Sequence, residues 1–325
     1  MSAKGYLRLI RPQQWYKNLL VFLAIIFVEI PKEWPWETLP AIFRLSNYPP
    51  LIMGFLVLCA VSSSTYIIND IMDIEEDAAH PEKKNRPLPS GEVSKSTSYV
   101  LAIALLASGL VLAYYLSRMF FLCILLYLFN SQAYNRFLSN YAVIDVAAIA
   151  LGFVIRAVSG TFLIGVKFTS WLVIGVFFFA LVLGFGKRKN ELQLLGDDAP
   201  EHKSVFTQYT DTMLDHGISI SATWVVLFYA LYTYENYRSV MVTQPVMITV
   251  PVAASIILRY IYLLQIGSPV GRKPHLAIKD KGILVGAIIF GLVLLLTLFF
   301  WQPILSFFND LFPAPPDVPD VTDMP

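Results

Sequence analysis

Residues 69–77 read Asn69-Asp70-Ile71-Met72-Asp73-Ile74-Glu75-Glu76-Asp77 and lie where a long apolar run ends. On a helix, Asn69, Asp73 and Asp77 share one face, and Asp70 lies beside them at the three-residue step. Carboxylates on one face repel each other unless a cation lies between them, and hard oxygen ligands suit Mg²⁺ bound to a phosphorylated substrate. We expect Asn69, Asp70, Asp73 and Asp77 to bind Mg²⁺; the alternative is a solvated helix end.

The composition of the chain is that of a polytopic membrane protein. Of 325 residues, 56% are hydrophobic and 14% are charged, and the mean hydropathy is +0.61. These values exclude an ordinary soluble domain. The net charge of +1 gives no indication of nucleic-acid binding. Cys59 and Cys123 both lie inside apolar runs, so we expect no disulfide framework.

Apolar runs of about 20 residues predict nine membrane-spanning helices and an all-α fold. The spans lie near residues 15–30, 49–68, 99–116, 119–137, 143–166, 171–186, 217–234, 245–266 and 283–307. Only Ser117 and Arg118 separate the third span from the fourth, which predicts a tight helical hairpin. We expect residues 1–310 to form a single transmembrane domain and residues 311–325, rich in Pro and Asp, to form a separate tail.

The distribution of Lys and Arg between alternate loops predicts the orientation of the chain. One side carries most of them, whereas the other has Lys32, Arg44, Arg118, Lys167 and Arg238. Because basic loops stay in the cytoplasm, the N-terminus is predicted inside and, with an odd number of spans, the C-terminus outside. The acidic cluster and a second polar loop, residues 187–216, then face the cytoplasm together, which predicts a shared pocket.

The residues of the acidic cluster carry a family resemblance. The pattern Asn69-Asp70-x-x-Asp73-x-x-x-Asp77, followed by Asn85-Arg86-Pro87-Leu88 and Gly91, resembles the first signature of the UbiA superfamily of membrane prenyltransferases. The resemblance implies nine helices around a central cavity open to the cytoplasmic side, and Mg²⁺-dependent binding of a diphosphate. The superfamily usually has a second Asp-rich motif after its sixth helix, but the loop here begins Lys187-Arg188-Lys189-Asn190-Glu191-Leu192. This departure argues against a prenyl diphosphate donor.

Further motifs resemble one branch, the polyprenyl-phosphate phosphoribosyltransferases. They are Arg11-Pro12-x-Gln14-Trp15-x-Lys17-Asn18, Lys187-Arg188-x-x-Glu191-Leu192 with His202 and Tyr209, and Arg259-Tyr260. The resemblance implies a Mg²⁺-dependent enzyme that transfers 5-phosphoribose from phosphoribosyl pyrophosphate to a polyprenyl phosphate of the decaprenyl-phosphate type and releases pyrophosphate. It also implies the inner (cytoplasmic) membrane of a bacterium and a role in cell wall biosynthesis.

The charges of the chain agree with such substrates. The donor carries a 5-phosphate and a pyrophosphate, and the acceptor carries a third anionic group, so the site needs several cations. We expect Asp73 and Asp77 to act through Mg²⁺, and Lys187 and Arg188 to bind donor phosphates, although positive-inside loops also place Lys and Arg here. Glu191 is expected to contact ribose hydroxyls or to pair with Lys187.

Other polar residues within or near the spans complete the predicted substrate site. Arg156 lies deep in the fifth span, where it either contacts a substrate phosphate or pairs with a carboxylate of a neighbouring helix. Lys17 and Asn18 either contact substrate or reach to the interface. The full set of predicted substrate-binding residues is Lys17, Asn18, Arg86, Tyr134, Arg156, Glu191, Tyr209 and Arg259.

Two other functions fit parts of the sequence. A prenyltransferase that moves an isoprenoid from its diphosphate to an aromatic acceptor would need a second acidic metal site, which the Lys187 loop lacks. A transporter that uses the acidic cluster for cation coupling would need a matching feature near the membrane midplane of the other half. The sequence is compatible with a homo-oligomer.

Overall fold

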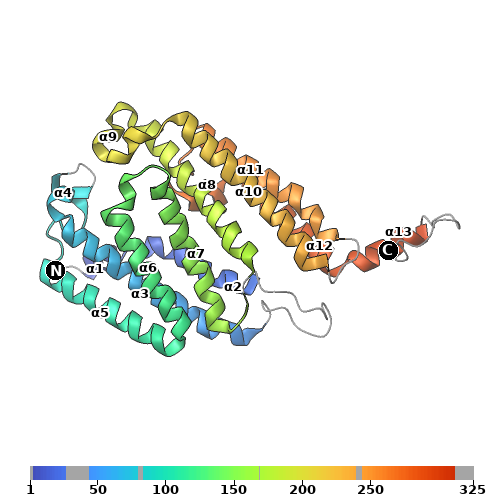
Figure 1. The fold of residues 1–325 in the computed structure, drawn as a ribbon, viewed down its shortest axis with the longest axis horizontal. Helices are drawn as coiled ribbons and strands as arrows, with labels where there is room; N and C mark the ends of the chain where they lie inside the picture. Colours follow the sequence, from blue (N-terminus) through green and yellow to red (C-terminus); the bar gives the residue numbers. More distant parts are fainter. Residues whose placement is uncertain (1–2, 27–43, 80–82, 168, 239–243, 312–325) are drawn as a thin grey trace.

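The computed structural model describes residues 3–26, 44–79, 83–167, 169–238 and 244–311, and in these ranges the chain is all-helical, without strands (Figure 1). The predicted all-α fold is confirmed for these ranges. The long helices are α3 (Tyr48–Met72), α5 (Lys95–Leu116), α6 (Arg118–Arg136), α7 (Ile144–Ile164), α8 (Ser170–Leu195), α10 (Asp211–Arg238), α11 (Thr249–Gln265) and α12 (Lys281–Phe299). Shorter elements are α1 (Ala3–Leu9), α2 (Leu23–Ile26), α4 (Ile74–Ala79), α9 (Ala199–His202), α13 (Trp301–Leu311) and 3₁₀-helices η1 (Pro12–Phe22), η3 (Leu45–Asn47), η4 (Lys83–Asn85), η5 (Leu138–Asn140), η6 (Gly196–Asp198), η7 (Ser204–Gln208), η8 (Pro245–Ile248) and η9 (Pro274–Lys279).

The first predicted span differs from expectation in its described part. Instead of a continuous α-helix from residue 15, the chain forms the 3₁₀-helix η1 followed by one turn of α-helix, α2. Arg11 precedes η1 in the left-handed region, with φ 52°, and Pro12 supplies no backbone donor, so α1 cannot continue into the span. Residues 27–30 of the predicted span lie outside the described residues.

The predicted hairpin between the third and fourth spans is confirmed. Ser117 is the only residue between α5 and α6, and its φ of −166° is extended. The Ser117 side chain accepts a hydrogen bond from the backbone N–H of Phe120 (3.4 Å), which caps α6 where its first amides lack helical partners. One residue therefore ends one helix and starts the next.

The last predicted span, residues 283–307, is not one helix. The helix α12 ends at Phe299, Phe300 has φ −117° and ψ 3°, and α13 begins at Trp301. Pro303 falls in the first turn of α13, where the missing N–H costs nothing, but it could not continue α12. Figure 1 shows α13 leading away from the bundle, at the end opposite α4 and α9.

The bundle is organised around α7. On one side α7 packs on α8, which packs along α10, and α11 and α12 follow; on the other side it packs on α6 and η1, with α3 and α5 beyond. The two largest buried clusters reflect this division, since Val146 and Ala150 of α7 join the α8–α10–α11 cluster while Ile155 packs on the η1–α3–α6 cluster. The polar loops at α4 and α9 lie toward the same end of the bundle in Figure 1.

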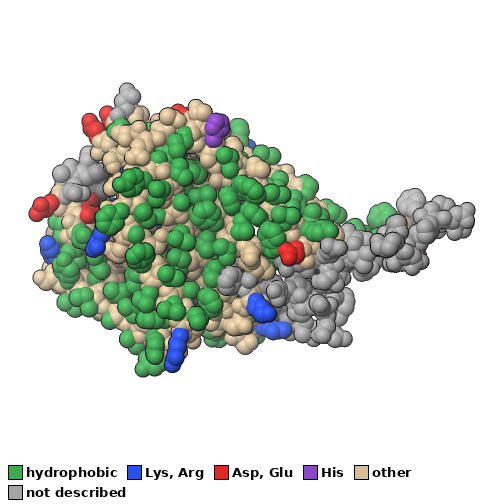
Figure 2. Space-filling view, viewed as in Figure 1, with side chains coloured by type: hydrophobic (Ala, Val, Ile, Leu, Met, Phe, Trp, Pro, Cys, Tyr) green, Lys and Arg blue, Asp and Glu red, His purple; other side chains and the backbone are tan. Residues whose placement is uncertain are grey.

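The outer surface is apolar. Figure 2 shows hydrophobic side chains over most of the visible face, with charged side chains mainly near its rim. Six described helical stretches are long and apolar enough to cross a bilayer: Leu45–Met72, Lys95–Leu116, Ile144–Ile164, Asp211–Glu235, Pro245–Gln265 and Lys281–Phe299. The protein is therefore an integral membrane protein. For the segments 15–30, 119–137 and 171–186, a membrane span stays a prediction.

Candidate active site

The acidic cluster lies at the junction of α3 and α4. The helix α3 ends at Met72, and Asp73 is its C-cap with φ −95° and ψ 12°. Backbone hydrogen bonds from Asp73 N to Asn69 O (2.9 Å) and from Asp77 N to Asp73 O (2.8 Å) preserve the four-residue step across the junction. The break nevertheless turns the side chains apart, so that Asp70 and Asp77 are buried whereas Asp73 is exposed and Asn69 is half-buried.

Arg86 joins the two buried carboxylates. Its Nη1 atom donates to Asp70 Oδ1 at 3.1 Å and to Asp77 Oδ2 at 2.5 Å. Arg11 also pairs with Asp70. The residues that converge are thus Asp70 and Asp77, which are seven positions apart. The Arg86 guanidinium lies between their carboxylates.

The loop after α4 holds Arg86 in this place. Leu88 is buried among apolar side chains of α1, α3 and α5 and anchors the loop. Ser90 N donates to Arg86 O (3.0 Å) and Gly91 N donates to Leu88 O (3.1 Å), which closes a tight turn. Gly91 adopts φ +74°, a conformation that glycine reaches without strain.

The chemistry of this site fits Mg²⁺. In the described part of the chain, no three Asp, Glu, His or Cys side chains form a complete ligand set. Mg²⁺ does not need one, because it is commonly held by one or two carboxylates together with waters and substrate phosphates. Two buried carboxylates that already meet at one cationic atom meet this requirement.

The N-terminal 3₁₀-helix η1 docks on a run of serines in α3. Ser63 Oγ donates to Ile10 O (2.7 Å) and accepts from Trp15 Nε1 (3.1 Å). Asn18 Nδ2 donates to Ser62 Oγ (3.2 Å), which leaves the Asn18 carbonyl oxygen directed at α7. Small residues let the two backbones approach closely, as at Gly160 of α7, which lies against the Val21 backbone.

Arg156 of α7 is a buried cation with neutral partners. Its side chain donates to Asn18 Oδ1 (2.9 Å), Gly152 O (2.8 Å) and Tyr127 Oη (2.9 Å), and its guanidinium carbon lies 4.4 Å from the centre of the Tyr127 ring. Arg156 is 6% exposed. None of its contacts in the described residues is a carboxylate, so the predicted structural ion pair is not formed there. A buried charge of this kind favours an anionic ligand.

Lys17 lies in η1 next to Asn18, whose side-chain oxygen accepts a hydrogen bond from Arg156 of α7 (2.9 Å). A contact of Lys17 with substrate stays a prediction, as does a pocket shared by the acidic cluster and the Lys187 loop.

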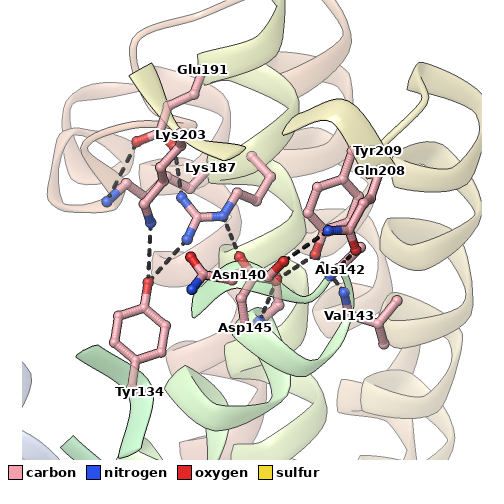
Figure 3. Close-up of polar contacts among 12 residues, drawn as sticks. Tyr134, Asn140, Ala142, Val143, Asp145, Lys187, Glu191, Lys203, Gln208 and Tyr209 are labelled. Atoms are coloured by element: carbon pink, nitrogen blue, oxygen red, sulfur yellow. Dashed lines mark hydrogen bonds and ion pairs between the residues drawn. The ribbon is translucent and has the colours of Figure 1, made fainter. Parts of the chain in front are cut away.

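The second loop is organised around a buried ion pair between α7 and α8 (Figure 3). Arg188 Nε donates to Asp145 Oδ2 at 2.7 Å, and both side chains are buried. Tyr209 Oη donates to Asp145 Oδ1 (2.5 Å) and accepts from Val143 N (2.7 Å). Burial and the bond to Asp145 raise the pKa of Tyr209, so its hydroxyl stays protonated and donates at neutral pH.

The remaining donors of Arg188 are also bound. Nη1 donates to Glu191 Oε2 (2.8 Å) and Nη2 donates to Tyr134 Oη (3.1 Å), which also accepts from Lys203 Nζ (3.3 Å). Lys187 lies at the edge of this network, 3.6 Å from Glu191, and its side chain is 49% exposed, against 3% for Arg188. Lys187 is therefore the exposed member of this network, while Arg188 and Tyr209 are buried behind it.

Two other basic residues are engaged in ion pairs. Arg259 pairs with Asp280 through two bonds, at 3.1 and 3.0 Å, and Asp280 caps α12 by accepting from Ile283 N (2.9 Å). The Arg259 guanidinium lowers the pKa of Asp280 to about 2. Lys189 pairs with Asp215 of α10. Both contacts are between elements of the fold and leave the predicted substrate role of Arg259 a prediction.

Several residues of the site were missed from the sequence. Asp145 was not a predicted site residue, yet it pairs with Arg188. Tyr127 and Arg11 contact Arg156 and Asp70, and neither was a predicted site residue. The run Ser62-Ser63-Ser64 in the middle of an apolar span is a usable signal, since small polar residues there mark close helix contacts.

Comparison with known proteins identifies the family. A family model for the UbiA prenyltransferase family matches residues 39–274, most of the chain. The chain belongs to the UbiA family. This UbiA protein is 31% identical over 238 residues to a decaprenyl-phosphate phosphoribosyltransferase of Mycolicibacterium smegmatis, covering 73% of this chain and 72% of the relative. It is 30% identical over 232 residues to a protein of the same name from Mycobacterium tuberculosis, covering 71% and 74%.

Solved structures share the fold of this UbiA protein. A UbiA homolog from Archaeoglobus fulgidus, bound to GPP and Mg²⁺, superposes with a TM-score of 0.62 at 19% identity, covering 93% of this chain and 99% of the other. At this identity the likeness establishes the fold. Together with its relatives, it identifies the protein as a membrane-embedded transferase.

Proposed function

We propose that this UbiA-family protein transfers 5-phosphoribose from phosphoribosyl pyrophosphate to a polyprenyl phosphate of the decaprenyl-phosphate type and releases pyrophosphate. The observation that carries the proposal is Arg156, a buried guanidinium in the middle of α7 whose partners among the described residues are all neutral. A reaction between two phosphorylated substrates requires such positive charge beyond one metal site. The relatives named decaprenyl-phosphate phosphoribosyltransferase agree with this assignment.

The residues divide into three groups in this proposal. Asp70 and Asp77 would hold Mg²⁺, which would neutralise the leaving pyrophosphate; the ligand roles of Asn69 and Asp73 stay predictions. Arg86 and Lys187 bind phosphates of the donor. Lys17 and Arg156 bind the acceptor phosphate.

The reaction itself is a displacement at the anomeric carbon. An oxygen of the lipid phosphate forms a bond to C1 of the ribose as the bond from C1 to pyrophosphate breaks, and positive charge develops on the ring in the transition state. The nucleophile is ionised at neutral pH, so no general base is required. Glu191, held by Arg188 at 2.8 Å, is positioned by the network to accept from ribose hydroxyls.

The proposal places the site at the cytoplasmic face of a bacterial inner membrane, with the N-terminus inside and the C-terminus outside. The basic loops argue for this orientation. A homo-oligomer and a separate tail at residues 311–325 also stay predictions.

The decisive experiment supplies labelled phosphoribosyl pyrophosphate, Mg²⁺ and polyprenyl phosphates of several lengths to the purified protein. We expect a labelled lipid product and stoichiometric pyrophosphate. Parallel reactions receive a prenyl diphosphate and an aromatic acceptor. Transfer only in those parallel reactions would reject the proposal in favour of a prenyltransferase, and turnover in neither set would reject both.

A further inference from the structure

The helix α13 follows the apolar helix α12, which is long enough to cross a bilayer, and Phe300 is the only residue between them. Charged residues mark the start of α12, because Asp280 caps it and Lys281 is its first residue. With 19 residues at a rise of 1.5 Å each, α12 is about 28 Å long, close to the ~30 Å thickness of the hydrocarbon core. The hydrocarbon core therefore ends near Phe300, and α13 begins at the membrane surface.

The side chains of α13 are divided between an apolar and a polar face. Apolar side chains recur at the i, i+3, i+4, i+7 spacing of a single helix face, and they are Trp301, Ile304, Leu305, Phe307, Phe308 and Leu311. The other face carries Ser306, Asn309 and Asp310, and all three are exposed. This division is typical of a helix that lies along the boundary between an apolar and an aqueous phase.

Much of the apolar face is exposed within the protein. Phe307 is 62% exposed, Phe308 is 52% exposed and Leu311 is 56% exposed. The helix break at Phe300 turns α13 out of the direction of α12, and Figure 1 shows it leading away from the bundle. These side chains would be hydrated if α13 projected into water, which costs free energy, whereas a helix lying in the membrane interface would bury them.

We propose that α13 lies in the plane of the membrane surface, at the end of the bundle opposite α4 and α9, with its apolar face buried in the lipid bilayer. The lipid is favoured over a second copy of the chain because α12 ends in the bilayer and one residue, Phe300, cannot carry the start of α13 far from it. Asp310 is the only charged residue of Trp301–Leu311, and it is negative. The binding therefore depends on apolar burial and does not need anionic headgroups.

The test places a nitroxide spin label on α13 of the full-length protein in nanodiscs of zwitterionic lipid. Phe307→Cys and Phe308→Cys carry the label on the apolar face, and Ser306→Cys and Asp310→Cys carry it on the polar face. Each label is exposed to oxygen, which concentrates in the bilayer, and to a water-soluble nickel chelate. We expect oxygen to dominate at the two apolar positions and the nickel chelate to dominate at the two polar positions, following the helical period.

Three controls calibrate this measurement. Leu292→Cys on the exposed side of α12 gives the signal of lipid, and Glu201→Cys on α9 gives the signal of water. The native thiols of Cys59 and Cys123 are buried, and the unsubstituted protein carried through the labelling reaction shows any label that they take up.

A matched pair of double variants tests the apolar face itself, with the label at Leu311→Cys. Phe307→Asp with Phe308→Asp should shift the label from lipid to water by at least about tenfold, because two buried rings are lost. Ser306→Asp with Asn309→Asp adds the same charge to the polar face and should leave the label in lipid.

Three results would overturn the proposal. Dominance of the nickel chelate at all four positions would place α13 in water. Protection of the Phe307 and Phe308 positions from both reagents would show that a second copy or another protein surface covers the apolar face. A lipid signal that appears only when anionic lipid is added would show that headgroup charge holds the helix, whereas the same profile with and without anionic lipid supports apolar burial.

Discussion

At the scale of single residues, the acidic cluster and Arg156 have opposite electrostatic situations. Asp70 and Asp77 are buried anions whose charge is already balanced by Arg86 and Arg11. Arg156 is a buried cation, and its described partners are all neutral. At Asp70 and Asp77 one cation can be exchanged for another, whereas Arg156 favours the binding of an anion.

Asp77→Asn should lower the apparent affinity for Mg²⁺ by at least about tenfold, because one of two converging carboxylates is neutralised. Transfer measured over a range of Mg²⁺ concentrations gives this value. Glu75→Gln is the control, since Glu75 lies on α4 but is exposed, and its Mg²⁺ dependence should match the wild type. Identical Mg²⁺ curves for both variants would contradict the metal assignment.

Arg156→Gln should raise the KM for the lipid phosphate by about 10- to 100-fold, the range expected for loss of a charge-assisted hydrogen bond. The melting temperature should fall moderately as well, because the change removes buried hydrogen bonds to Asn18, Gly152 and Tyr127. Arg156→Lys should retain part of the affinity. A large drop in melting temperature with an unchanged KM would mean that Arg156 is structural.

At the scale of helices and their contacts, α7 determines where the site residues lie. One end of α7 carries Asp145, which holds Arg188 of α8, and its middle carries Arg156 and Gly152. Gly160, further along, brings η1 so close that an added Cβ would lie 2.0 Å from Val21 O. The positions of Lys17 and Asn18 thus depend on a glycine about four turns from Asp145 and on its neighbours.

Gly160→Ala should destabilise the protein by about 1–3 kcal/mol, as overpacking against backbone does. Gly175→Ala in α8 is the control, since no atom lies within 4 Å of its added Cβ, and it should leave stability unchanged or slightly higher. Thermal unfolding in detergent measures both. Equal melting temperatures for the two variants would contradict the close packing of η1 on α7.

Asp145→Asn should destabilise the protein by about 3 kcal/mol, because it removes the fully buried one of the two carboxylates that pair with Arg188. Replacing both residues, Asp145→Leu with Arg188→Met, should recover much of this stability. Unfolding of the two single variants and the double variant gives the coupling between them. Additive losses would show that the pair does not interact.

Some features of this structure can be predicted from the sequence and others cannot. The long helices follow from runs of apolar residues. The hairpin at Ser117 follows because the two neighbouring apolar runs leave too few residues between them for a longer loop. The acidic cluster follows from its spacing, although the break at Asp73 changed which carboxylates meet. The pair of Asp145 with Arg188 could not be predicted, because it depends on which faces of α7 and α8 pack together. The 3₁₀ geometry of η1, which packs on the serines of α3, was not predicted either.

At the scale of the whole molecule, the protein combines an apolar outer surface with charged groups that are balanced by ion pairs within the fold. The apolar helices α5, α11 and α12 are mostly unburied within the protein, and α4 and α9 lie toward the same end of the bundle (Figure 1). The acidic pair at that end carries its own guanidinium counter-ions. The fold therefore does not depend on a bound metal for its charge balance.

Removal of the metal should abolish activity but leave the stability of the protein almost unchanged. A chelator should abolish transfer, since Mg²⁺ is required by the proposed reaction, but the melting temperature should stay within about 2 °C of that in Mg²⁺ without substrate. Adding Mg²⁺ back should restore activity completely. A melting temperature that falls by several degrees in the chelator would mean that the ion is part of the fold.

The 3₁₀ geometry of η1 arranges its side chains in three strips along the helix. A 3₁₀-helix has three residues per turn, so Trp15, Asn18 and Val21 align and all face the bundle. Tyr16 falls on the second strip, where its ring contacts that of His275, and Lys17 falls on the third. Inserting a single residue before Trp15 would rotate every strip by a third of a turn, so the contacts of Trp15, Tyr16 and Asn18 would each pass to a different side chain.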